Sequence, residues 1–503
     1  MRPVSSPDYC VGVVGLGAMG QGIAQVSAMG GMRTLLFDAK PGAAEAGRAQ
    51  IAQRLQRLVE KGRLAAEACT AALELLQPVG ALEELAPADA VIEAVVEDLE
   101  VKKAVFAALE DCLGEEAIIA SNTSSIPIAA IARHCRRPGR VGGMHFFNPV
   151  PLMKLVEVVR GPDTDPATCA HMAEIGTRMT RTPVQVKDAP GFLVNMGGRA
   201  YTTEGLRLQH EGVAGPAAID AILRDCCGFR MGPFELMDLT GIDVNYPASV
   251  FIYEGYVNDP RIATAPQHRA LYEAGRFGRK TRRGHFDYDE AGNRIDQASA
   301  DHAPAGPAAR TAVLAEPDER LAAFAAALGL AILERDDGES PILAYPLGED
   351  ATAVALRCGA DHRRLVALDL SARTDRRITL MTAPGADPAA ADGVAAAAVA
   401  SGRKATLIKD SPGFVAQRMR AAIANLGCYM AQIDLARPEE IDLAMKLGLN
   451  YPLGPLEIAE DLGLSATLTI LQTLQAITGE DRYRPSLWLR RRALLGLGVH
   501  VAN

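Results

Sequence analysis

Residues 9–20 read Tyr9-Cys-Val-Gly-Val-Val-Gly15-Leu-Gly17-Ala-Met-Gly20, and this stretch decides the fold of the first part of the chain. A short apolar run leads directly into three glycines, and a helical stretch follows them. Gly15 permits a tight turn, Gly17 allows a ligand to approach the backbone, and Gly20 allows the helix to pack closely on the strand. The N-terminus of that helix offers N–H donors and positive potential. The stretch therefore predicts an α/β domain of the Rossmann type that binds a dinucleotide.

Asp38 indicates which dinucleotide binds. It ends the next apolar segment, Arg33-Thr-Leu-Leu-Phe-Asp38, and lies eighteen residues after Gly20. An acid at this spacing accepts hydrogen bonds from a ribose 2′-hydroxyl and repels a 2′-phosphate. We therefore expect NAD rather than NADP as the cofactor. The alternative is a glycine-rich turn in a sheet that binds nothing.

A lone imidazole and a lone carboxylate interrupt an apolar stretch between residues 143 and 159. His145 lies near the end of a predicted strand, residues 148–151 form a turn with two prolines, and Glu157 lies in a second predicted strand. A hairpin would bring the two side chains together, and a paired carboxylate fixes the histidine tautomer. The alternative is a histidine packed in the core and a glutamate on an exposed edge.

Composition excludes several classes of protein. The 503 residues exceed one compact core, and a formal charge of -9 argues against nucleic-acid binding. No apolar run reaches the length of a membrane span, and the first seven residues lack a signal-peptide core. The nine cysteines are scattered, so neither a disulfide framework nor a metal site is predicted. We expect a cytoplasmic protein that binds neither membranes nor nucleic acid.

The second half of the chain repeats part of the first. Lys409-Asp-Ser-Pro-Gly-Phe414 repeats Lys187-Asp-Ala-Pro-Gly-Phe192, and Gly454-Pro-Leu-Glu457 repeats Gly232-Pro-Phe-Glu235. Both matches have one offset (409 - 187 = 454 - 232 = 222). Two matches at one offset predict a second copy of a helical unit. The α/β segment before this copy lacks a Gly-x-Gly-x-x-Gly run, so we expect no second NAD site there.

The predicted fold is thus an α/β Rossmann-type domain, an all-α domain, a reduced α/β unit and a second all-α copy. In the first all-α domain, helices are predicted at Asn195 to Leu208, Pro216 to Cys227 and Pro233 to Thr240. In the reduced unit, strands are predicted at residues 312–315, 341–344, 365–368 and 377–381. The predicted boundaries are 9–186, 187–290, a linker at 291–310, then 311–402 and 403–503.

With these motifs, the chain resembles the 3-hydroxyacyl-CoA dehydrogenase family over nearly all of its length. The segments that carry the resemblance are Gly15-Leu-Gly-Ala-Met-Gly20, Glu93-Ala-Val-Val-Glu97, Ala120-Ser-Asn-Thr-Ser-Ser125, His145-Phe-Phe-Asn-Pro149, Lys187-Asp-Ala-Pro-Gly-Phe-Leu-Val-Asn195 and Gly232-Pro-Phe-Glu-Leu236. A two-copy chain without a hydratase domain resembles the branch that oxidises 3-hydroxybutyryl-CoA and 3-hydroxyadipyl-CoA in phenylacetate degradation.

The resemblance implies roles for individual residues. His145 corresponds to the catalytic base and Glu157 to the residue that orients it, while Ser124 and Asn195 correspond to substrate contacts. Without the resemblance, turn hydrogen bonding is the better explanation of Ser124, and helix capping is the better explanation of Asn195. Four further candidates complete the predicted site: Glu97 at the nicotinamide ribose, Lys61 at the phosphates of coenzyme A, and Asn148 and Arg199 at the substrate.

Two of these candidates are basic residues with simpler explanations. Lys61 shares a predicted helix face with Arg54 and Arg57, a pattern that also suits a solvated surface. Arg199 lies four residues after Asn195, so one helix would place both on one face, near the distal carboxylate of a substrate such as 3-hydroxyadipyl-CoA. The simpler role for Arg199 is a structural ion pair, for example with Glu204.

The resemblance therefore implies NAD-dependent oxidation of an (S)-3-hydroxyacyl-CoA to the 3-ketoacyl-CoA, a step of β-oxidation. One alternative is a small β-hydroxyacid dehydrogenase, which would need a lysine in a glycine-rich helix, and no such segment is found. Another is an inactive NAD-binding structural or regulatory protein. The acyl-CoA substrate is the predicted partner; a homo-oligomer is an open alternative, and the two helical copies are expected to form an internal pseudo-dimer.

Overall fold

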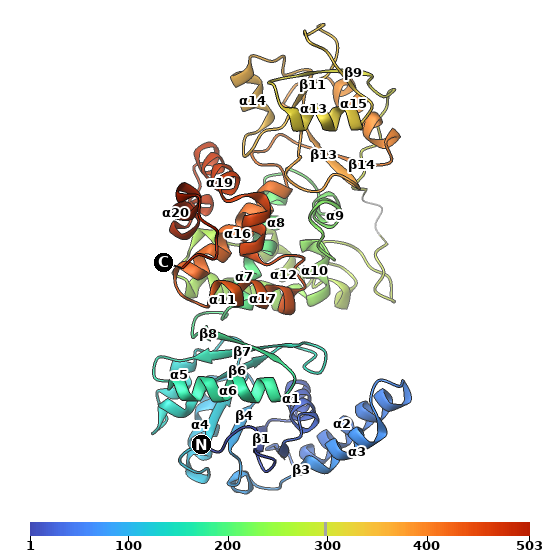
Figure 1. Cartoon of the computed structure of the whole chain (residues 1–503). Helices are drawn as coiled ribbons and strands as arrows, with labels where there is room; N and C mark the ends of the chain where they lie inside the picture. Colours follow the sequence, from blue (N-terminus) through green and yellow to red (C-terminus); the bar gives the residue numbers. More distant parts are fainter. Residues whose placement is uncertain (296–298, 503) are drawn as a thin grey trace. The chain divides into compact units, whose positions relative to one another are not determined.

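The computed structural model describes residues 1–295 and 299–502, and the chain divides into two compact units (Figure 1). The first comprises residues 1–196 and 434–449, and the second comprises residues 197–433 and 450–503. The segment 434–449 lies in the second half of the sequence, yet it packs with the first unit. Within the described residues, no helix is both long enough and apolar enough to cross a membrane.

An eight-stranded sheet forms the centre of the first unit, in the order β3-β2-β1-β4-β5-β6-β7-β8. Neighbouring strands are parallel except β6 and β7, which form an antiparallel pair. Parallel strands need crossovers, and these are mostly helical here, as in Rossmann folds. The strands are β1 (Cys10–Val14), β2 (Arg33–Phe37), β3 (Leu76–Pro78), β4 (Ala90–Glu93), β5 (Ile118–Ser121), β6 (Val141–Phe146), β7 (Leu155–Arg160) and β8 (Thr182–Lys187).

Helices cover this sheet and bury an apolar core that includes Val11, Ile23, Ile92 and Val156. Because both faces of the central strands are covered, β1 and β4 consist entirely of buried residues. The helices of the unit are α1 (Ala18–Met29), α2 (Ala43–Glu60), α3 (Ala66–Leu75), α4 (Leu99–Cys112), α5 (Ile128–Ala132), α6 (Pro166–Arg178), α7 (Val194–Gly197) and α17 (Pro438–Leu449).

The second unit contains two sets of helices and a smaller sheet. The first set is α8 (Arg199–His210), α9 (Pro216–Cys227), α10 (Pro233–Thr240), α11 (Ile242–Gly255) and α12 (Pro266–Glu273). The second set is α16 (Ala416–Gln432), α18 (Pro455–Leu462), α19 (Leu464–Thr478) and α20 (Leu487–Leu495). Helix α10 and helix α18 have the same bounds at the offset of 222, and α16 packs against α8. The repeat predicted from sequence is therefore confirmed in the structure.

A buried cluster of charges lies between these two sets of helices. The Glu204 carboxylate in α8 accepts hydrogen bonds from the guanidinium groups of Arg418 (3.0 Å) and Arg482 (2.8 Å), and from the Tyr483 hydroxyl (3.0 Å). Glu204 and Arg418 are fully buried. Burial raises the pKa of Glu204, but the two guanidinium groups outweigh it and hold that pKa below its usual range. The first copy and the second copy are thus joined by paired buried charges.

The smaller sheet has six strands in the order β10-β9-β11-β12-β13-β14. As in the first sheet, one pair is antiparallel, β12 with β13, and the other described pairs are parallel. The strands are β9 (Thr311–Leu314), β10 (Ala331–Ile332), β11 (Ile342–Ala344), β12 (Leu365–Leu368), β13 (Arg377–Met381) and β14 (Lys404–Ile408), and the helices are α13 (Glu319–Ala327), α14 (Ala351–Cys358) and α15 (Pro388–Ala400). This is the abbreviated α/β unit that the sequence predicted.

Helices α9 and α17 are equivalent at the offset of 222 (438 - 216 = 449 - 227 = 222), and each packs on a sheet. Helix α9 of the first copy packs on β13 of the smaller sheet, whereas α17 of the second copy packs on β7 and β8 of the larger sheet. The Glu440 side chain of α17 also accepts a hydrogen bond from the Gln185 backbone N–H in β8. The two copies have thus exchanged these helices.

The structure corrects the sequence prediction at three places. A single helix was predicted from Asn195 to Leu208, but the structure has α7 and α8, separated at Gly198. Strand β10 was not predicted, and β14 extends the smaller sheet to residue 408, beyond the predicted domain end at 402. The two other helices predicted there match α9 and α10. Residues 296–298 of the predicted linker lie outside the described residues.

Candidate active site

The glycine turn after β1 has the geometry that a dinucleotide needs. Gly15 has a φ of 91°, and a Cβ there would lie 2.6 Å from the Ala94 carbonyl oxygen. A Cβ at Gly20 would lie 1.7 Å from the Gly15 carbonyl oxygen, so only glycine lets α1 start this close to the turn. Among the described residues, by contrast, a Cβ at Gly17 would meet no atom within 4 Å, and no side chain caps α1. The turn therefore leaves the N-terminus of α1 open to a phosphate group.

Asp38 follows β2 and lies beside this turn. Its carboxylate accepts a hydrogen bond from the Leu16 backbone N–H (2.7 Å) and another from the Lys40 N–H (2.9 Å). The carboxylate is thus fixed at the carboxyl end of the sheet, next to Gly15 and Gly17. This is where a Rossmann domain holds the ribose of its nucleotide.

His145 and Glu157 meet across the antiparallel pair β6 and β7, as the predicted hairpin requires. They are directly opposite in register, and His145 Nδ1 lies 2.5 Å from Glu157 Oε2. Glu157 is fully buried and His145 is 3% exposed. The alternative of an exposed edge glutamate is therefore wrong. Because the carboxylate accepts, Nδ1 carries the hydrogen and Nε2 is left as the nitrogen that can accept a proton.

The second oxygen of Glu157 fixes the segment that carries Asn195. Glu157 Oε1 accepts hydrogen bonds from the backbone N–H groups of Leu193 (3.0 Å) and Val194 (2.8 Å). These residues lead into α7, whose second residue is Asn195. One buried carboxylate therefore holds both the imidazole of His145 and the start of the helix with Asn195.

Ser124 lies on the other side of the imidazole. Its Oγ is 3.0 Å from His145 Nε2, and its backbone N–H donates to Glu97 Oε1 (3.0 Å). The same oxygen of Glu97 accepts from the hydroxyl groups of Thr123 and Ser125. Glu97, expected at a ribose, thus also holds the loop that presents Ser124.

The pKa of Glu97 reflects these contacts. Burial raises it, but hydrogen bonds from Thr123 and Ser125 and the charge of Lys102 outweigh burial and lower the pKa below its usual range. The Lys102 Nζ lies 3.3 Å from Glu97 Oε2 and 2.7 Å from Glu93 Oε1. Glu97 is therefore ionised at neutral pH and suited to accept hydrogen bonds.

Four residues that support the site were not singled out from the sequence: Glu93, Lys102, Ser121 and Asn122. Glu93 and Lys102 form an ion pair in which both side chains are at most 1% exposed, and Ser121 Oγ also donates to Glu93 (2.6 Å). Asn122 accepts a hydrogen bond from the Phe146 N–H and so ties β5 to β6 beside His145. The sequence held one sign that Lys102 is buried: it stands four residues before Phe106 and so lies on the same, buried face of α4.

Aromatic rings lie beside His145, and two further candidates for ligand contacts lie at the surface. The rings of Phe147 and Phe192 flank His145, with centroids 4.6 Å and 5.6 Å from that of the imidazole. Asn148 is exposed, and Lys61 is exposed at the C-terminal end of α2. Both side chains are therefore accessible to a ligand.

Arg199 belongs to the second unit, at the start of α8. It is buried, its guanidinium donates to Ser249 Oγ (2.7 Å), and burial lowers its pKa to about 10. The alternative role of Arg199 was an ion pair with Glu204. The described contacts of the Glu204 carboxylate are with Arg418, Arg482 and Tyr483, and Arg199 is not among them.

Comparison with known proteins agrees with this geometry. The model of the 3-hydroxyacyl-CoA dehydrogenase NAD-binding domain matches residues 10–189, and the model of that family's C-terminal domain matches residues 191–288 and again 413–500. The chain belongs to the 3-hydroxyacyl-CoA dehydrogenase family. It is an NAD-dependent oxidoreductase, and membership excludes the small β-hydroxyacid dehydrogenase alternative.

Some relatives of this dehydrogenase match nearly the whole chain, with both copies of the helical domain, and others match only the part with the first copy. It is similar to 3-hydroxyadipyl-CoA dehydrogenase of Escherichia coli, with 37% identity over 97% of this chain and 98% of the relative. The crystal structure of 3-hydroxybutyryl-CoA dehydrogenase from Escherichia coli superposes with a TM-score of 0.86, at 36% identity over 97% of this chain and 98% of that one. The structure of (S)-3-hydroxybutyryl-CoA dehydrogenase from Ralstonia eutropha covers 56% of this chain and 100% of its own, with 36% identity and a TM-score of 0.54.

Proposed function

We propose that this dehydrogenase oxidises short-chain (S)-3-hydroxyacyl-CoA to 3-ketoacyl-CoA with His145 as the general base. The observation that carries the proposal is the geometry of the imidazole: Nδ1 bonds to buried Glu157, and Nε2 lies 3.0 Å from Ser124 Oγ. NAD held by the turn at Gly15 to Gly20 and by Asp38 would supply the acceptor for the hydride from the substrate C3. His145 Nε2 takes the hydroxyl proton as the carbonyl forms, and in the reverse direction it returns that proton.

Glu157 supports this role in two ways. Its Oε2 holds the imidazole in the tautomer that leaves Nε2 unprotonated, and its negative charge stabilises the imidazolium that forms. Its Oε1 holds the N–H groups at the start of α7. We therefore assign Glu157 as a positioning residue, and Ser124 and Asn195 as donors to the substrate oxygen.

The relatives' names support a substrate with a short acyl chain, either 3-hydroxybutyryl-CoA or 3-hydroxyadipyl-CoA. The (S) configuration is supported by the name of a one-copy relative. For 3-hydroxyadipyl-CoA, Arg199 is our candidate partner of the distal carboxylate, since it lies four residues after Asn195 and a guanidinium binds a carboxylate in a bidentate way. Asn148 is a further candidate contact of the substrate, and Lys61 of the phosphates of coenzyme A.

A steady-state screen tests this assignment. We expect NADH formation with the (S) isomers of 3-hydroxybutyryl-CoA and 3-hydroxyadipyl-CoA, and loss of turnover with retained NADH binding in His145→Ala. The Arg199→Met variant is compared on 3-hydroxyadipyl-CoA and 3-hydroxyhexanoyl-CoA, which have the same chain length. Equal losses on both substrates would remove Arg199 from substrate recognition, and full turnover in His145→Ala would remove the proposed base.

We further propose that the two helical copies form an internal pseudo-dimer, so that the second copy serves as a built-in partner rather than a second catalyst. Packing of α16 on α8 and the buried pairs of Glu204 support this. A chain truncated after Ala309 should aggregate or dimerise, and a soluble, equally stable monomer would oppose the proposal. A cytoplasmic location is likewise proposed, supported by nine cysteines that are all unpaired in the described chain.

A further inference from the structure

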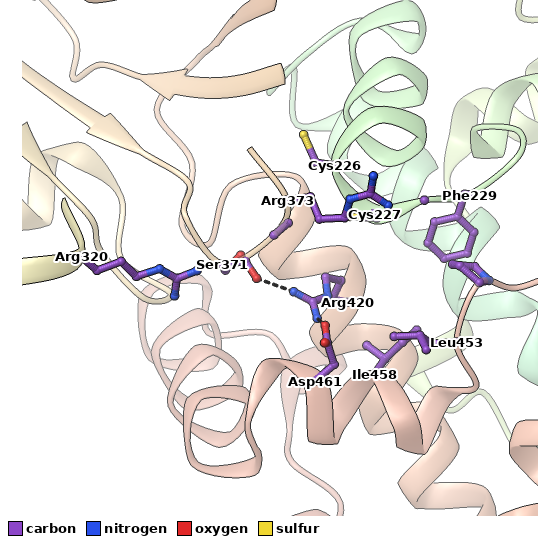
Figure 2. Close-up of a pocket in the computed structure, with 13 residues that line it drawn as sticks. Cys226, Cys227, Phe229, Arg320, Ser371, Arg373, Arg420, Leu453, Ile458 and Asp461 are labelled. Carbon is purple, nitrogen blue, oxygen red and sulfur yellow. Dashed lines mark hydrogen bonds and ion pairs between the residues drawn. The ribbon is translucent and has the colours of Figure 1, made fainter. Parts of the chain in front are cut away.

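A cavity of about 510 Å³ lies in the second unit, among residues of the second copy and the end of α9. Figure 2 shows three arginine side chains in its wall. This volume falls in the range of small-molecule sites. Its wall consists of Cys226, Cys227, Gly228, Phe229, Arg320, Ser371, Ala372, Arg373, Arg420, Pro452, Leu453, Ile458 and Asp461.

The cavity occupies a place in the smaller sheet that corresponds to the catalytic edge of the larger one. Residues 371–373 follow β12, the strand before the antiparallel step, just as residues 147–149 follow β6. Arg320 is the second residue of α13, which follows β9 as α1 follows β1. In sheets of this type, ligands bind beyond the carboxyl ends of the strands. The cavity is thus in the position of a ligand site although the catalytic residues have no counterpart there.

The wall of the cavity carries excess positive charge. Arg320 is exposed, donates to the Leu370 carbonyl oxygen and forms no ion pair within the described residues. Arg373 is exposed, and its nearest acidic partner, Asp375, is 3.5 Å away. Arg420 is buried and pairs with Asp461. The wall therefore contains three guanidinium groups and one carboxylate, that of Asp461. Counted over the wall residues, this is an excess of two positive charges (3 - 1 = 2).

The remaining wall is neutral or apolar. Burial raises the pKa of Cys227 to about 12, so this thiol is neutral at physiological pH. Phe229, Leu453 and Ile458 supply an apolar side (Figure 2). A cavity with guanidinium groups on one side and apolar side chains on the other matches an organic anion with a short apolar body.

We propose that this cavity is a second, non-catalytic binding site for a small organic dianion. Guanidinium groups bind carboxylates and phosphates in the same bidentate way, so the ligand is either a short dicarboxylate or a phosphate ester. The site is formed by the smaller α/β unit, the second helical copy and the end of α9, and it is independent of the His145 chemistry. It gives the second copy a ligand of its own after the loss of catalytic groups.

The test is isothermal titration calorimetry on the full-length chain with two probes, adipate and adenosine 3′,5′-bisphosphate. The variant Arg320→Gln/Arg373→Gln removes two of the three guanidinium groups. The matched control is Arg376→Gln, an exposed arginine close in sequence that does not line the cavity. Turnover of acetoacetyl-CoA with NADH is measured in all proteins and should be unchanged, because none of these residues lies in the catalytic machinery.

We expect the wild type and Arg376→Gln to bind at least one probe at a site that the double variant binds roughly tenfold or more weakly. Loss of adipate binding alone identifies a dicarboxylate site, and loss of the bisphosphate alone identifies a phosphate-ester site. The exposed Arg373→Gln single variant repeats the test with the smallest change to folding, and should show the same direction. Equal binding of both probes by the wild type and both variants, or no binding to the wild type, would overturn the proposal.

Discussion

The variant Glu157→Gln tests the proposed base through the histidine tautomer. Glutamine has the shape of glutamate but one carbonyl oxygen and one NH₂ group. Glu157 Oε1 accepts two backbone N–H groups, from Leu193 and Val194, so the carbonyl oxygen of the glutamine belongs there. Its NH₂ group then faces His145 Nδ1, which must accept, and the imidazole hydrogen moves to Nε2. The nitrogen that should take the substrate proton is then already protonated.

The structure sets the size of the effect. The active tautomer returns only if the glutamine amide rotates so that its carbonyl oxygen faces His145 Nδ1. The two backbone N–H groups, of Leu193 and Val194, then lose their acceptor, which costs about 1–3 kcal/mol each and roughly 2–6 kcal/mol in all. At about 1.4 kcal/mol per factor of ten, the active form falls about 30-fold to 10⁴-fold. This range overlaps the roughly 10²–10⁴-fold that positioned acid–base catalysis supplies.

The assay is kcat for oxidation of (S)-3-hydroxybutyryl-CoA by NAD at a fixed pH, because Nε2 must accept a proton in this direction. It is run together with NADH binding by fluorescence and thermal unfolding of each protein. We expect kcat to fall within that range while NADH affinity changes little. Ser124→Ala is the comparison, because it removes a donor near Nε2 but leaves the tautomer unchanged. A Glu157→Gln enzyme that folds and keeps kcat within about twofold of the wild type would refute the tautomer argument.

Three further predictions concern the cofactor, the core and the exchanged helix. Asp38→Ala should narrow the preference for NAD over NADP in kcat/KM, since it removes a ribose acceptor and a repulsive charge; an unchanged ratio would place Asp38 away from the ribose. Glu204→Gln should lower the free energy of unfolding by roughly 3–5 kcal/mol, because Arg418 and Arg482 remain buried without the carboxylate. The pKa of Glu204 is lowered in the folded chain, so this stabilisation is present above the ordinary glutamate pKa and is lost as pH falls through the lowered pKa. In urea unfolding at neutral and acid pH, the stability of the wild type should therefore approach that of Glu204→Gln in acid. A stability difference that stays constant with pH would contradict this prediction. Gly448→Val should lower kcat, because even a Cβ there would lie 3.1 Å from side-chain carbons of Leu155 and Val194, and unchanged turnover would show that α17 does not support the site.

Much of the first unit could be predicted because its signals are local. The turn at Gly15 to Gly20 joins one strand directly to one helix, and the contact that requires glycine at position 20 is with the Gly15 carbonyl oxygen, only five residues away. The pairing of His145 with Glu157 follows from two strands joined by a short turn, where register is set by proximity in the chain. Helices α9 and α10 begin at Pro216 and Pro233, and proline is common at the first helical position.

The features that sequence did not reveal depend on residues far apart in the chain. Lys102 is an ordinary helix lysine by composition, and its burial is decided by Glu93 and Glu97 on other elements. Gly198 interrupts the first-copy helix, while its counterpart at the offset of 222, Arg420, lies inside the continuous helix α16. Here the glycine itself was a local signal of the break, because glycine has a much lower helix propensity than arginine.

The exchanged helix α17 affects how the two copies can diverge. Helix α17 packs on β7, the strand that carries Glu157, and Gly448 faces Val194 at the start of α7. Selection on the reaction in the first unit therefore acts directly on residues 438–449, far away in the gene. A break in the chain before residue 438 would therefore remove from the first unit a helix that packs against the strand of Glu157.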